Sequence, residues 1–211
     1  MFSEGRRRTN KNAELKTTGR EDMPGFEDGR IEYRQIRGDE ICRELFSTFI
    51  RHQVVTKCWR KENGKWLVRD APFIDDWSEK DYETLTVCLK HTVDSGGFVY
   101  GAFYDGRLKG FVSVESGLFG GEHRYLDLSS IHVSEDMRGN GMGKELFLAA
   151  VKWAKSKGAA KLYISSHSAV ESQAFYKTMG CVEAQMYHQK HVEAEPFDCQ
   201  LEFAVEQRGQ I

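Results

Sequence analysis

The sequence predicts a single α/β domain, in which strand-like and helix-like segments alternate along the chain. One observation is the glycine-rich turn at 138–143, which joins an apolar, strand-like segment at 125–133 to an amphipathic segment at 141–157. A second is the Asp105-Gly106 pair between two more strand-like segments, a strong signal for a β-hairpin. The length of 211 residues fits one domain with an extension, or at most two small domains.

Composition and charge describe an ordinary soluble globular protein. With 40% apolar residues and a formal net charge of −2, the chain has no overall attraction to nucleic acid or to a membrane surface. No stretch approaches the roughly 18 apolar residues of a membrane-spanning helix, and the first residues lack the apolar core of a signal peptide. Five cysteines without close pairs indicate reduced thiols. We therefore expect a cytoplasmic protein with no nucleic-acid or membrane partner.

The folded domain is expected to span residues 31–205. Residues 1–30 are polar and contain several glycines, so they predict a flexible N-terminal tail, and 206–211 are expected to form a short C-terminal tail. The N-terminal tail contains three consecutive arginines at 6–8, for which RNA binding is an alternative to a simple solvated segment.

The first part of the domain predicts a strand and two helices. Residues 31–36 alternate in polarity as a strand does, and Asp39 can cap a helix that follows. The apolar face of that helix would consist of Ile41, Leu45, Phe46 and Phe49. A second helix is expected at about 78–93, with its apolar residues on one side and two glycines after it.

The later part predicts six strands and two helices. The strands are expected at 98–104, 108–115, 125–133, 161–165, 181–189 and 197–205. The helices are expected at 141–157 and 168–179. The second of them would begin with a capping box, in which Ser168 is the N-cap and Glu171 the N3 residue.

An additional hairpin is predicted between the first two helices, within an insert at 57–77. Strand-like residues flank the Asn-Gly pair at 63–64, and a two-residue turn there would pair Trp59 with Val68. Trp66 would share their face. The insert would either recognise a substrate or serve as a lid or dimer contact, so a homodimer stays open.

The turn at 138–143 has the features of a phosphate site. Its alternate glycines leave main-chain N–H groups uncovered at a helix start, where the helix dipole also favours an anion. Arg138 and Lys144 add positive charge at its two ends, and a turn without a ligand is the alternative. A P-loop is excluded because Glu145 stands where Ser or Thr is needed, and the Gly-x-Gly-x-Gly spacing is not that of a dinucleotide-binding fold.

A second motif lies further along the chain. Residues 168–180 read Ser-x-x-x-Ser-x-x-Phe-Tyr-x-x-x-Gly. Together with Arg-x-x-Gly-x-Gly at 138–143, this motif resembles the GNAT superfamily of acetyl-CoA-dependent N-acetyltransferases. The resemblance covers residues 31–205 and is strongest over 125–181.

The resemblance implies the GNAT (acyl-CoA N-acyltransferase) fold, an α/β fold with a mixed, mostly antiparallel sheet flanked by helices. It also implies acetyl-CoA as cosubstrate, without a metal. The CoA pyrophosphate would lie on the glycine turn, and the pantetheine would extend along the preceding strand, whose main-chain N–H groups also stabilise the oxyanion. The residues implied to bind the cosubstrate are Ile131, His132, Val133, Arg138, Gly139, Asn140, Gly141, Met142, Gly143, Lys144, Ser168, Ser172, Phe175 and Tyr176.

Acetyl transfer from a thioester to an amine makes two demands on side chains. The amine has to lose a proton, because an alkylammonium with a pKa of about 10.4 has no lone pair, and the departing thiolate leaves more readily when it is protonated. The resemblance implies Tyr176 as the acid, with simple packing of its ring as the alternative. Asp127 is the candidate base and Glu115 the second choice. A structural role for Asp127, or a water chain without a single base, is the alternative.

Strict alternation along the strand at 125–133 predicts which side chains share a face. One face would carry Asp127, Ser129 and Ile131, and the other Leu126, Leu128 and Ser130. His132 would either assist proton transfer or be an ordinary, partly exposed residue.

The stretch at 188–198 is expected to border the acceptor site, as the resemblance implies. Its histidines, His188 and His191, and its three acids do not match a compact zinc site, so we expect no metal. The acids would attract a cationic amine or form a charged surface turn. The residues expected to contact the acceptor are Trp59, Trp77, Glu115, Glu193 and Glu195. The predicted activity is acetylation of a primary amine on a small cationic molecule. A protein lysine or N-terminal amine, or a CoA-binding sensor without turnover, is the alternative.

Overall fold

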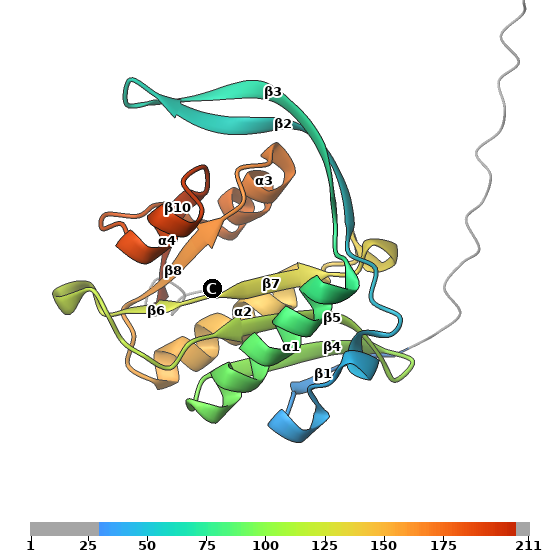
Figure 1. Cartoon of the computed structure of the whole chain (residues 1–211). Coiled ribbons are helices and arrows are strands. Elements are labelled where there is room, and N and C mark those ends of the chain that lie inside the picture. The colour runs from blue at the N-terminus through green and yellow to red at the C-terminus, as the bar shows by residue number, and fades with distance from the viewer. Residues whose placement is uncertain (1–29, 206–211) are drawn as a thin grey trace, which may run out of the picture.

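The computed structural model describes residues 30–205, which form two four-stranded sheets and a separate two-stranded hairpin (Figure 1). The tails expected at 1–30 and 206–211, including the arginines at 6–8, lie outside the described residues apart from residue 30. Within the described part of the chain, no helix is long and apolar enough to cross a membrane.

The first sheet is antiparallel throughout, with the order β1-β4-β5-β7. Its strands are β1 (Ile31–Gln35), β4 (Phe98–Tyr104), β5 (Arg107–Val114) and β7 (Ser130–Val133). The turn between β4 and β5 is the Asp105-Gly106 pair, and both residues have a positive φ, 50° and 70°. These angles suit an Asp-Gly hairpin turn, and the predicted hairpin is confirmed.

The second sheet has the order β6-β8-β10-β9, in which only β6 and β8 are parallel. Its strands are β6 (Tyr125–Asp127), β8 (Lys161–Ser166), β10 (Cys199–Ala204) and β9 (Val182–Glu183). The mixed, mostly antiparallel arrangement predicted from the sequence is confirmed.

A β-bulge divides the single strand expected at 125–133 into β6 and β7. Ser130 is paired with Ser113 of β5, and the Ser129 N–H also donates to Ser113 O at 3.1 Å. Ser129 and Ser130 of this strand therefore both face the single residue Ser113 of β5, as in a β-bulge. Before the bulge the strand pairs with β8, and after it the strand pairs with β5, so β7 and β8 diverge from this point.

The bulge also shifts the alternation of side chains by one position. Leu126 and Leu128 are buried in the main core, and Ile131 and Val133 pack against that same core. The predicted grouping of Ile131 with Asp127 is therefore wrong, because an extra residue in one strand resets which side chains point to which face.

Two long helices cover the first sheet from opposite faces (Figure 1). Helix α1 (Glu79–Asp94) belongs to a core cluster that contains Phe111 of β5. Helix α2 (Met142–Ser156) packs on Val112 and Val114, which point the other way from β5. Both helices were predicted, and α1 begins at a capping box formed with Ser78.

No α-helix follows Asp39. The segment forms two short 3-10 helices, η1 (Gly38–Glu40) and η2 (Arg43–Phe46). The Asp39 carboxylate accepts a hydrogen bond from the Arg37 guanidinium at 3.1 Å instead of capping a helix. The apolar residues expected on that helix still pack in the core beside α1, so their burial was predicted correctly and only the predicted secondary structure of the segment was wrong. The remaining 3-10 helices are η3 (Gly121–His123) and η4 (Glu135–Met137).

Helix α3 (Val170–Met179) begins later than predicted. Its N-cap is Ala169, which has no capping side chain. Ser168 is held by the hairpin instead, because its Oγ accepts from Arg60 at 2.6 Å and its carbonyl oxygen accepts from the Trp59 N–H at 2.8 Å. The predicted capping box is therefore wrong.

The long strand expected at 181–189 is reduced to β9 (Val182–Glu183). The chain then turns and forms helix α4 (Gln189–Ala194). The Ala184 N–H still donates to Gln200 O of β10 at 2.9 Å, and the next N–H, that of Gln185, donates to the Glu202 carboxylate at 3.0 Å as the chain turns.

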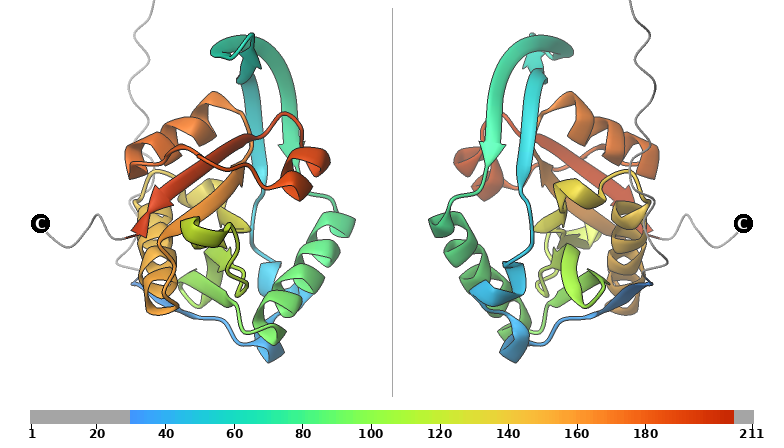
Figure 2. Two further views of the ribbon diagram at one scale, coloured as in Figure 1. Left: turned by 90° about the vertical axis from the view of Figure 1, so that its left-hand side faces the viewer. Right: turned by 90° about the vertical axis from the view of Figure 1, so that its right-hand side faces the viewer.

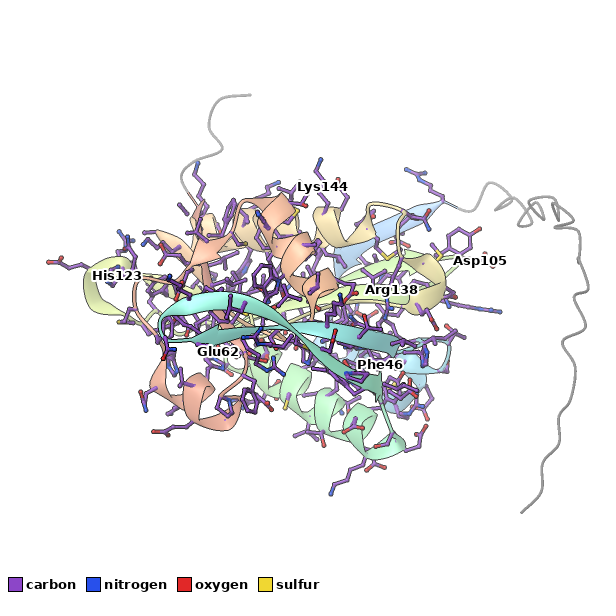
Figure 3. All side chains as sticks on the ribbon, turned by 90° about the horizontal axis from the view of Figure 1, so that it is seen from above. Phe46, Glu62, Asp105, His123, Arg138 and Lys144 are labelled. Carbon is purple, nitrogen blue, oxygen red and sulfur yellow. The ribbon has the colours of Figure 1, made fainter. Side chains whose placement is uncertain are left out.

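The hairpin formed by β2 (His52–Glu62) and β3 (Lys65–Asp76) arches away from the sheets above α3 (Figures 1 and 2). Seen from above, it crosses over the molecule (Figure 3). Trp59 pairs with Val68 around the turn at 63–64, as predicted, and β2 begins at His52, before the insert expected at 57–77.

Candidate active site

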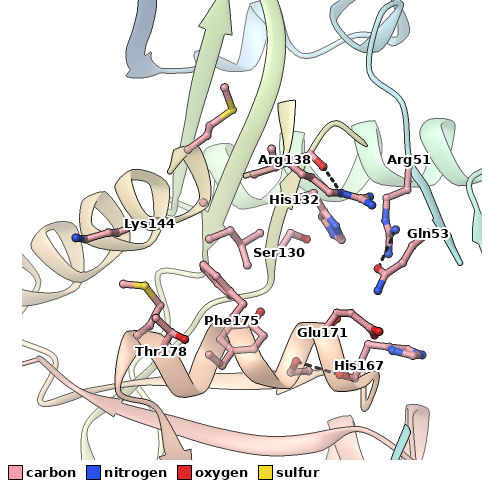
Figure 4. A pocket seen from close by; sticks show the side chains of 18 of the residues that line it. Arg51, Gln53, Ser130, His132, Arg138, Lys144, His167, Glu171, Phe175 and Thr178 are labelled. Atoms are coloured by element: carbon pink, nitrogen blue, oxygen red, sulfur yellow. Dashed lines mark hydrogen bonds between the residues drawn. The ribbon is translucent and has the colours of Figure 1, made fainter. Parts of the chain in front are cut away.

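A cavity of about 760 Å³ lies where β7 and β8 diverge (Figure 4). Its walls come from β7, the glycine-rich loop after it, the end of β8, helix α3 and the base of the hairpin. The predicted cosubstrate residues that line it are Ile131, His132, Val133, Arg138, Gly139, Gly141, Met142, Gly143, Lys144, Ser172, Phe175 and Tyr176. Asn140 and Ser168 do not line it.

One edge of β7 is paired with β5, and the other borders the cavity. The Ser134 N–H donates to Lys109 O at 2.8 Å. Main-chain groups alternate in direction along an antiparallel strand, so His132 and Ser134 bond toward β5. Ile131 and Val133 therefore direct their N–H and C=O groups toward the open edge, where an extended ligand can pair with them as an added strand does.

The loop after β7 presents free main-chain donors. Gly139 and Gly141 have φ values of 83° and 77°, a region that favours glycine. In residues 30–205, the N–H groups of 139–143 have no protein acceptor, whereas the Lys144 N–H donates to Gly141 O at 3.0 Å. The predicted anion site therefore consists of the N–H groups of 139–143 and does not include that of Lys144.

Basic side chains flank the cavity. Arg138 and Lys144 lie on opposite sides of it, with Arg51 near Arg138 (Figure 4). The Arg138 Nε donates to Val133 O at 3.4 Å. Arg51 has a 10% exposed side chain that is paired with Asp75, and its Nε is buried without a partner in the described chain. Burial lowers the pKa of Arg51 below its usual value, and the Arg138 charge adds to this effect.

Tyr176 lines the cavity from α3 and is 8% exposed. Burial raises the pKa of its phenol well above the ordinary value, and a hydrogen bond with Ser166 acts in the opposite direction. Tyr176 therefore keeps its proton at neutral pH, which a proton donor requires. Phe175 beside it packs against Phe147, with ring centroids 6.3 Å apart.

Asp127 is paired with a histidine from α4. Its Oδ2 lies 2.7 Å from His191 Nε2, and its Oδ1 is buried without a partner in residues 30–205. The hydrogen bond with Asp127 raises the pKa of His191, whereas burial acts in the opposite direction. Asp127 is opposite Tyr163 in the last pair of β6 and β8, so the Asp127–His191 pair lies at the point of divergence, beside the cavity lining.

Glu115 is held one hydrogen bond away from the cavity wall. Its Oε1 accepts from Ser129 Oγ and Thr92 Oγ1, both at 2.8 Å. Ser129 lines the cavity at the bulge. Glu115 follows directly after β5, and its N–H donates to Asp127 O at 2.8 Å, so the two predicted base candidates are neighbours.

His132 is packed among rings. Its ring centroid lies 4.7 Å from that of Trp77 and 5.4 Å from that of Phe111. Burial, together with the charges of Arg51 and Arg138, lowers the pKa of His132 to about 3. His132 is therefore neutral at physiological pH. Trp77, which was expected to contact the acceptor, packs with the α1 core.

The sequence also matches a known family. A family model described as "Acetyltransferase (GNAT) family" matches residues 60–181, which is more than half of the chain. The chain belongs to the GNAT family of acetyltransferases. The resemblance carried by the two motifs is confirmed, and the protein is an acetyltransferase of this type. No curated protein matches the chain.

Solved structures share the GNAT fold. Nourseothricin acetyltransferase matches with a TM-score of 0.60 and 18% identity, over 83% of this chain and 98% of that chain. A protein described as a streptothricin acetyltransferase from Bacillus anthracis str. Ames, in complex with acetyl coenzyme A, has a TM-score of 0.58 and 15% identity, over 82% and 96%. The PaiA N-acetyltransferase from Thermoplasma acidophilum, in complex with coenzyme A, has a TM-score of 0.53 and 18% identity, over 83% of this chain and 99% of that chain.

The donor set of this GNAT cavity fits acetyl-CoA. Free N–H groups at 139–143, at the start of α2, suit a diphosphate. The open edge at Ile131 and Val133 suits the amides of pantetheine. Among residues 30–205, no group of three or more His, Cys, Asp and Glu side chains could hold a metal ion.

The other predicted acceptor residues lie away from the cavity lining. Trp59 lies toward the end of β2, and its N–H donates to Ser168 O before α3. Glu193 is exposed on α4 and accepts from Gln189 at 3.0 Å, and Glu195 is exposed at the end of that helix.

Several cavity residues were not identified from the sequence. Arg51 and Gln53 reach the cavity from the hairpin base, and His167 and Glu171 reach it from the segment that starts α3 (Figure 4). His191 was noticed only as a metal candidate, because 64 residues separate it from Asp127. The inserted Asn-Gly hairpin was the one available signal, since it indicated an extra segment near the acceptor site.

Proposed function

We propose that this GNAT enzyme transfers the acetyl group of acetyl-CoA to a primary amine of a small cationic molecule, by direct attack of the amine on the thioester. The observation that carries the proposal is the row of free N–H donors at 139–143 next to the open edge of β7. A diphosphate bound there and a pantetheine paired with β7 would bring the thioester toward Tyr176, which lines the same cavity.

Each residue has one role in this reaction. The N–H groups of 139–143 hold the pyrophosphate, and those of Ile131 and Val133 orient the pantetheine and stabilise the oxyanion. Tyr176 gives its proton to the departing sulfur. Asp127 supplies the negative charge on which removal of the ammonium proton depends. His132, with its lowered pKa, remains neutral and contributes packing.

Carboxylates near the point of divergence support a cationic acceptor. Asp127 and Glu115 are adjacent there, and Asp198 accepts from Ser165 Oγ, on the cavity wall, at 3.2 Å. Their combined negative charge raises the local concentration of a cation. Burial raises the pKa of Asp198 above its usual value, whereas the hydrogen bond from Ser165 acts in the opposite direction.

The hairpin supports a small acceptor rather than a protein side chain. Its tip is attached to β9, because Glu183 accepts from Lys61 Nζ at 2.5 Å and from Trp66 Nε1 at 3.0 Å. The hairpin is thereby fixed as an arch above α3 (Figure 2), an arrangement that favours a small molecule over a folded protein as the acceptor. Two structures of the same fold bear the names of nourseothricin and streptothricin acetyltransferases, which agrees with this choice.

We further propose that the enzyme works in the cytoplasm with small molecules as its partners. All five cysteines are free thiols, a state typical of a reducing compartment.

The test is acetyl-CoA consumption against a panel of small polyamines, aminoglycoside-like amines and lysine peptides. We expect turnover with the small cations, a fall of roughly 10²-fold or more in kcat for Tyr176→Phe and Asp127→Asn, and unchanged CoA affinity for both. Tyr33→Phe, on β1, is the control and should behave as the wild type. Preference for lysine peptides would overturn the assignment of the acceptor, and CoA binding without turnover would make the protein a sensor.

A further inference from the structure

Asp127 cannot itself reach an acceptor amine in this structure. One carboxylate oxygen, Oδ2, is engaged by His191, and the other, Oδ1, is buried from solvent. The His191 side chain is 31% exposed, against 17% for Asp127. The imidazole therefore stands between the carboxylate and any molecule that approaches from outside.

The two nitrogens of His191 have different surroundings. Nε2 lies 2.7 Å from the Asp127 carboxylate, which favours the tautomer with hydrogen on Nε2. Within residues 30–205, Nδ1 has no hydrogen-bond partner and is not among the buried unpaired atoms. An imidazole held in this way has its basic lone pair on Nδ1, the nitrogen turned away from the carboxylate.

We propose that His191 is the base that takes the proton from the acceptor ammonium, and that Asp127 is the positioning residue that orients it. This inference rests on the acetyl transfer proposed above. It assigns to His191 a contact with substrate, and it gives the buried carboxylate the role of fixing the tautomer and stabilising the imidazolium.

The location of His191 fits this role. Its ring stacks on Tyr163 of β8, with centroids 5.8 Å apart, at the last pair of β6 and β8. Asp198, which lies close enough to influence the pKa of His191, is bonded to Ser165 on the cavity wall. His191 is therefore connected to the cavity wall through Asp198 and Ser165, and it does not itself line the cavity.

The proton transfers balance. The acceptor R–NH₃⁺ gives one proton to His191 Nδ1, and the nitrogen lone pair forms a bond to the acetyl carbon while the carbon–sulfur bond breaks. The sulfur takes the Tyr176 proton, and the second proton lost by the nitrogen returns to the Tyr176 oxygen. The imidazolium then releases its proton to water, so the net products are the amide, the free thiol and one proton.

The charged and titratable groups that face His191 set the direction of its pH dependence. These are Asp127 on β6, Tyr163 on β8, His188 at the start of α4, and Asp198 before β10. Asp127 raises the pKa of His191 above 6.5. Since the base has to be neutral, kcat should rise with pH through that raised pKa.

The experiment measures kcat against pH for the full chain with a small amine. His191→Gln, which can still donate to Asp127, should lower kcat roughly 10²-fold or more and remove the acidic limb of the profile. Asp127→Asn should move that limb to lower pH, because the charge that raises the His191 pKa is gone. Lys190→Gln, an exposed change on the same helix, is the control and should keep the wild-type profile. CoA affinity and melting temperature report whether each variant is folded.

A second measurement needs no variant. An NMR titration of wild-type His191 should give a pKa equal to that of the acidic limb, with hydrogen on Nε2 in the neutral form. Active wild-type enzyme with an unchanged profile in His191→Gln, or with a His191 pKa that does not match the limb, would overturn this inference and leave acetyl transfer intact. An inactive wild type with every amine would instead overturn the proposed function itself.

Discussion

The two halves of the proposed active site, for the cofactor and for the acceptor, are built from different kinds of contact. The cofactor half consists of β7, the glycine-rich loop and α3, which follow one another within the segment 130–179. The acceptor half joins Asp127 to His191 across 64 residues, and Glu183 to the hairpin tip across more than 100. Short-range patterns therefore describe the cofactor half, whereas the acceptor half depends on how distant segments meet in the fold.

The largest predicted effect is on the cofactor half alone. Gly141→Val forces a β-branched residue into a left-handed conformation, with φ at 77°, at a cost of about 1–2 kcal/mol or more. It also disturbs the N–H donors of the loop. We expect the Kd for CoA, measured by calorimetry, to rise roughly 10- to 100-fold. Gly117→Val is the control, since Gly117 has an ordinary φ and open space around it. Equal affinities for the two variants would refute the diphosphate site at 139–143.

The next effect concerns the acceptor half. Glu115→Gln keeps an oxygen that accepts from Ser129 and Thr92 but removes one negative charge. We expect the KM for the amine to rise about tenfold, which corresponds to about 1.4 kcal/mol, with an unchanged KM for acetyl-CoA. Steady-state kinetics with each substrate varied in turn would measure both. The exposed Glu122→Gln is the control, and a rise in the KM for acetyl-CoA would contradict the division into halves.

Local patterns in the sequence were sufficient for most of the fold. The Asp105-Gly106 turn and the glycine-rich start of α2 each act within a few residues, so the hairpin of β4 and β5 and helix α2 were predicted correctly, and so was α1 from its apolar periodicity. The mixed, mostly antiparallel sheet came from the resemblance to the GNAT family and was confirmed as well.

The errors occur where a distant segment overrides a local preference. Ser168 has the sequence of an N-cap, yet Arg60 of the hairpin binds its hydroxyl. The strand expected at 125–133 is interrupted because its two ends pair with different neighbours, β8 and β5. The contact between His191 and Asp127 could not be predicted from the sequence, because no local pattern indicates which part of the C-terminal segment packs against β6.

The attachment of the hairpin should depend on pH. Lys61 first, and then Tyr187 and Trp66, lower the pKa of Glu183 to about 2. Since the folded pKa lies below the unfolded value of 4.5, the attachment is fully stabilised above pH 4.5 and is lost as the pH falls toward 2. Protection factors for hydrogen exchange at residues 61–68, which correct for the intrinsic pH dependence of amide exchange, should therefore fall over that window in the wild type.

The matched variant for this attachment is Glu183→Gln. Its protection factors at 61–68 should already be lowered at pH 6 and should change little between pH 5 and 2. Because the Lys61–Glu183 ion pair is partly exposed, its removal costs little stability. We expect the KM for the amine to rise by up to about fivefold. A wild type and a variant with the same pH dependence would exclude Glu183 as the attachment point.

The smallest predicted effect distinguishes two roles for Ser168, a cap of α3 and a contact with the hairpin. Ser168→Ala should cost about 1 kcal/mol in urea unfolding under either interpretation. If Ser168 acts through the hairpin, Arg60→Met should have a similar cost, and the double variant should cost no more than either single one. If it acts as a cap of α3, the two costs should add. The lack of additivity would identify the hairpin as part of the folded unit that carries α3, and thus as a wall of the active site rather than a separate appendage.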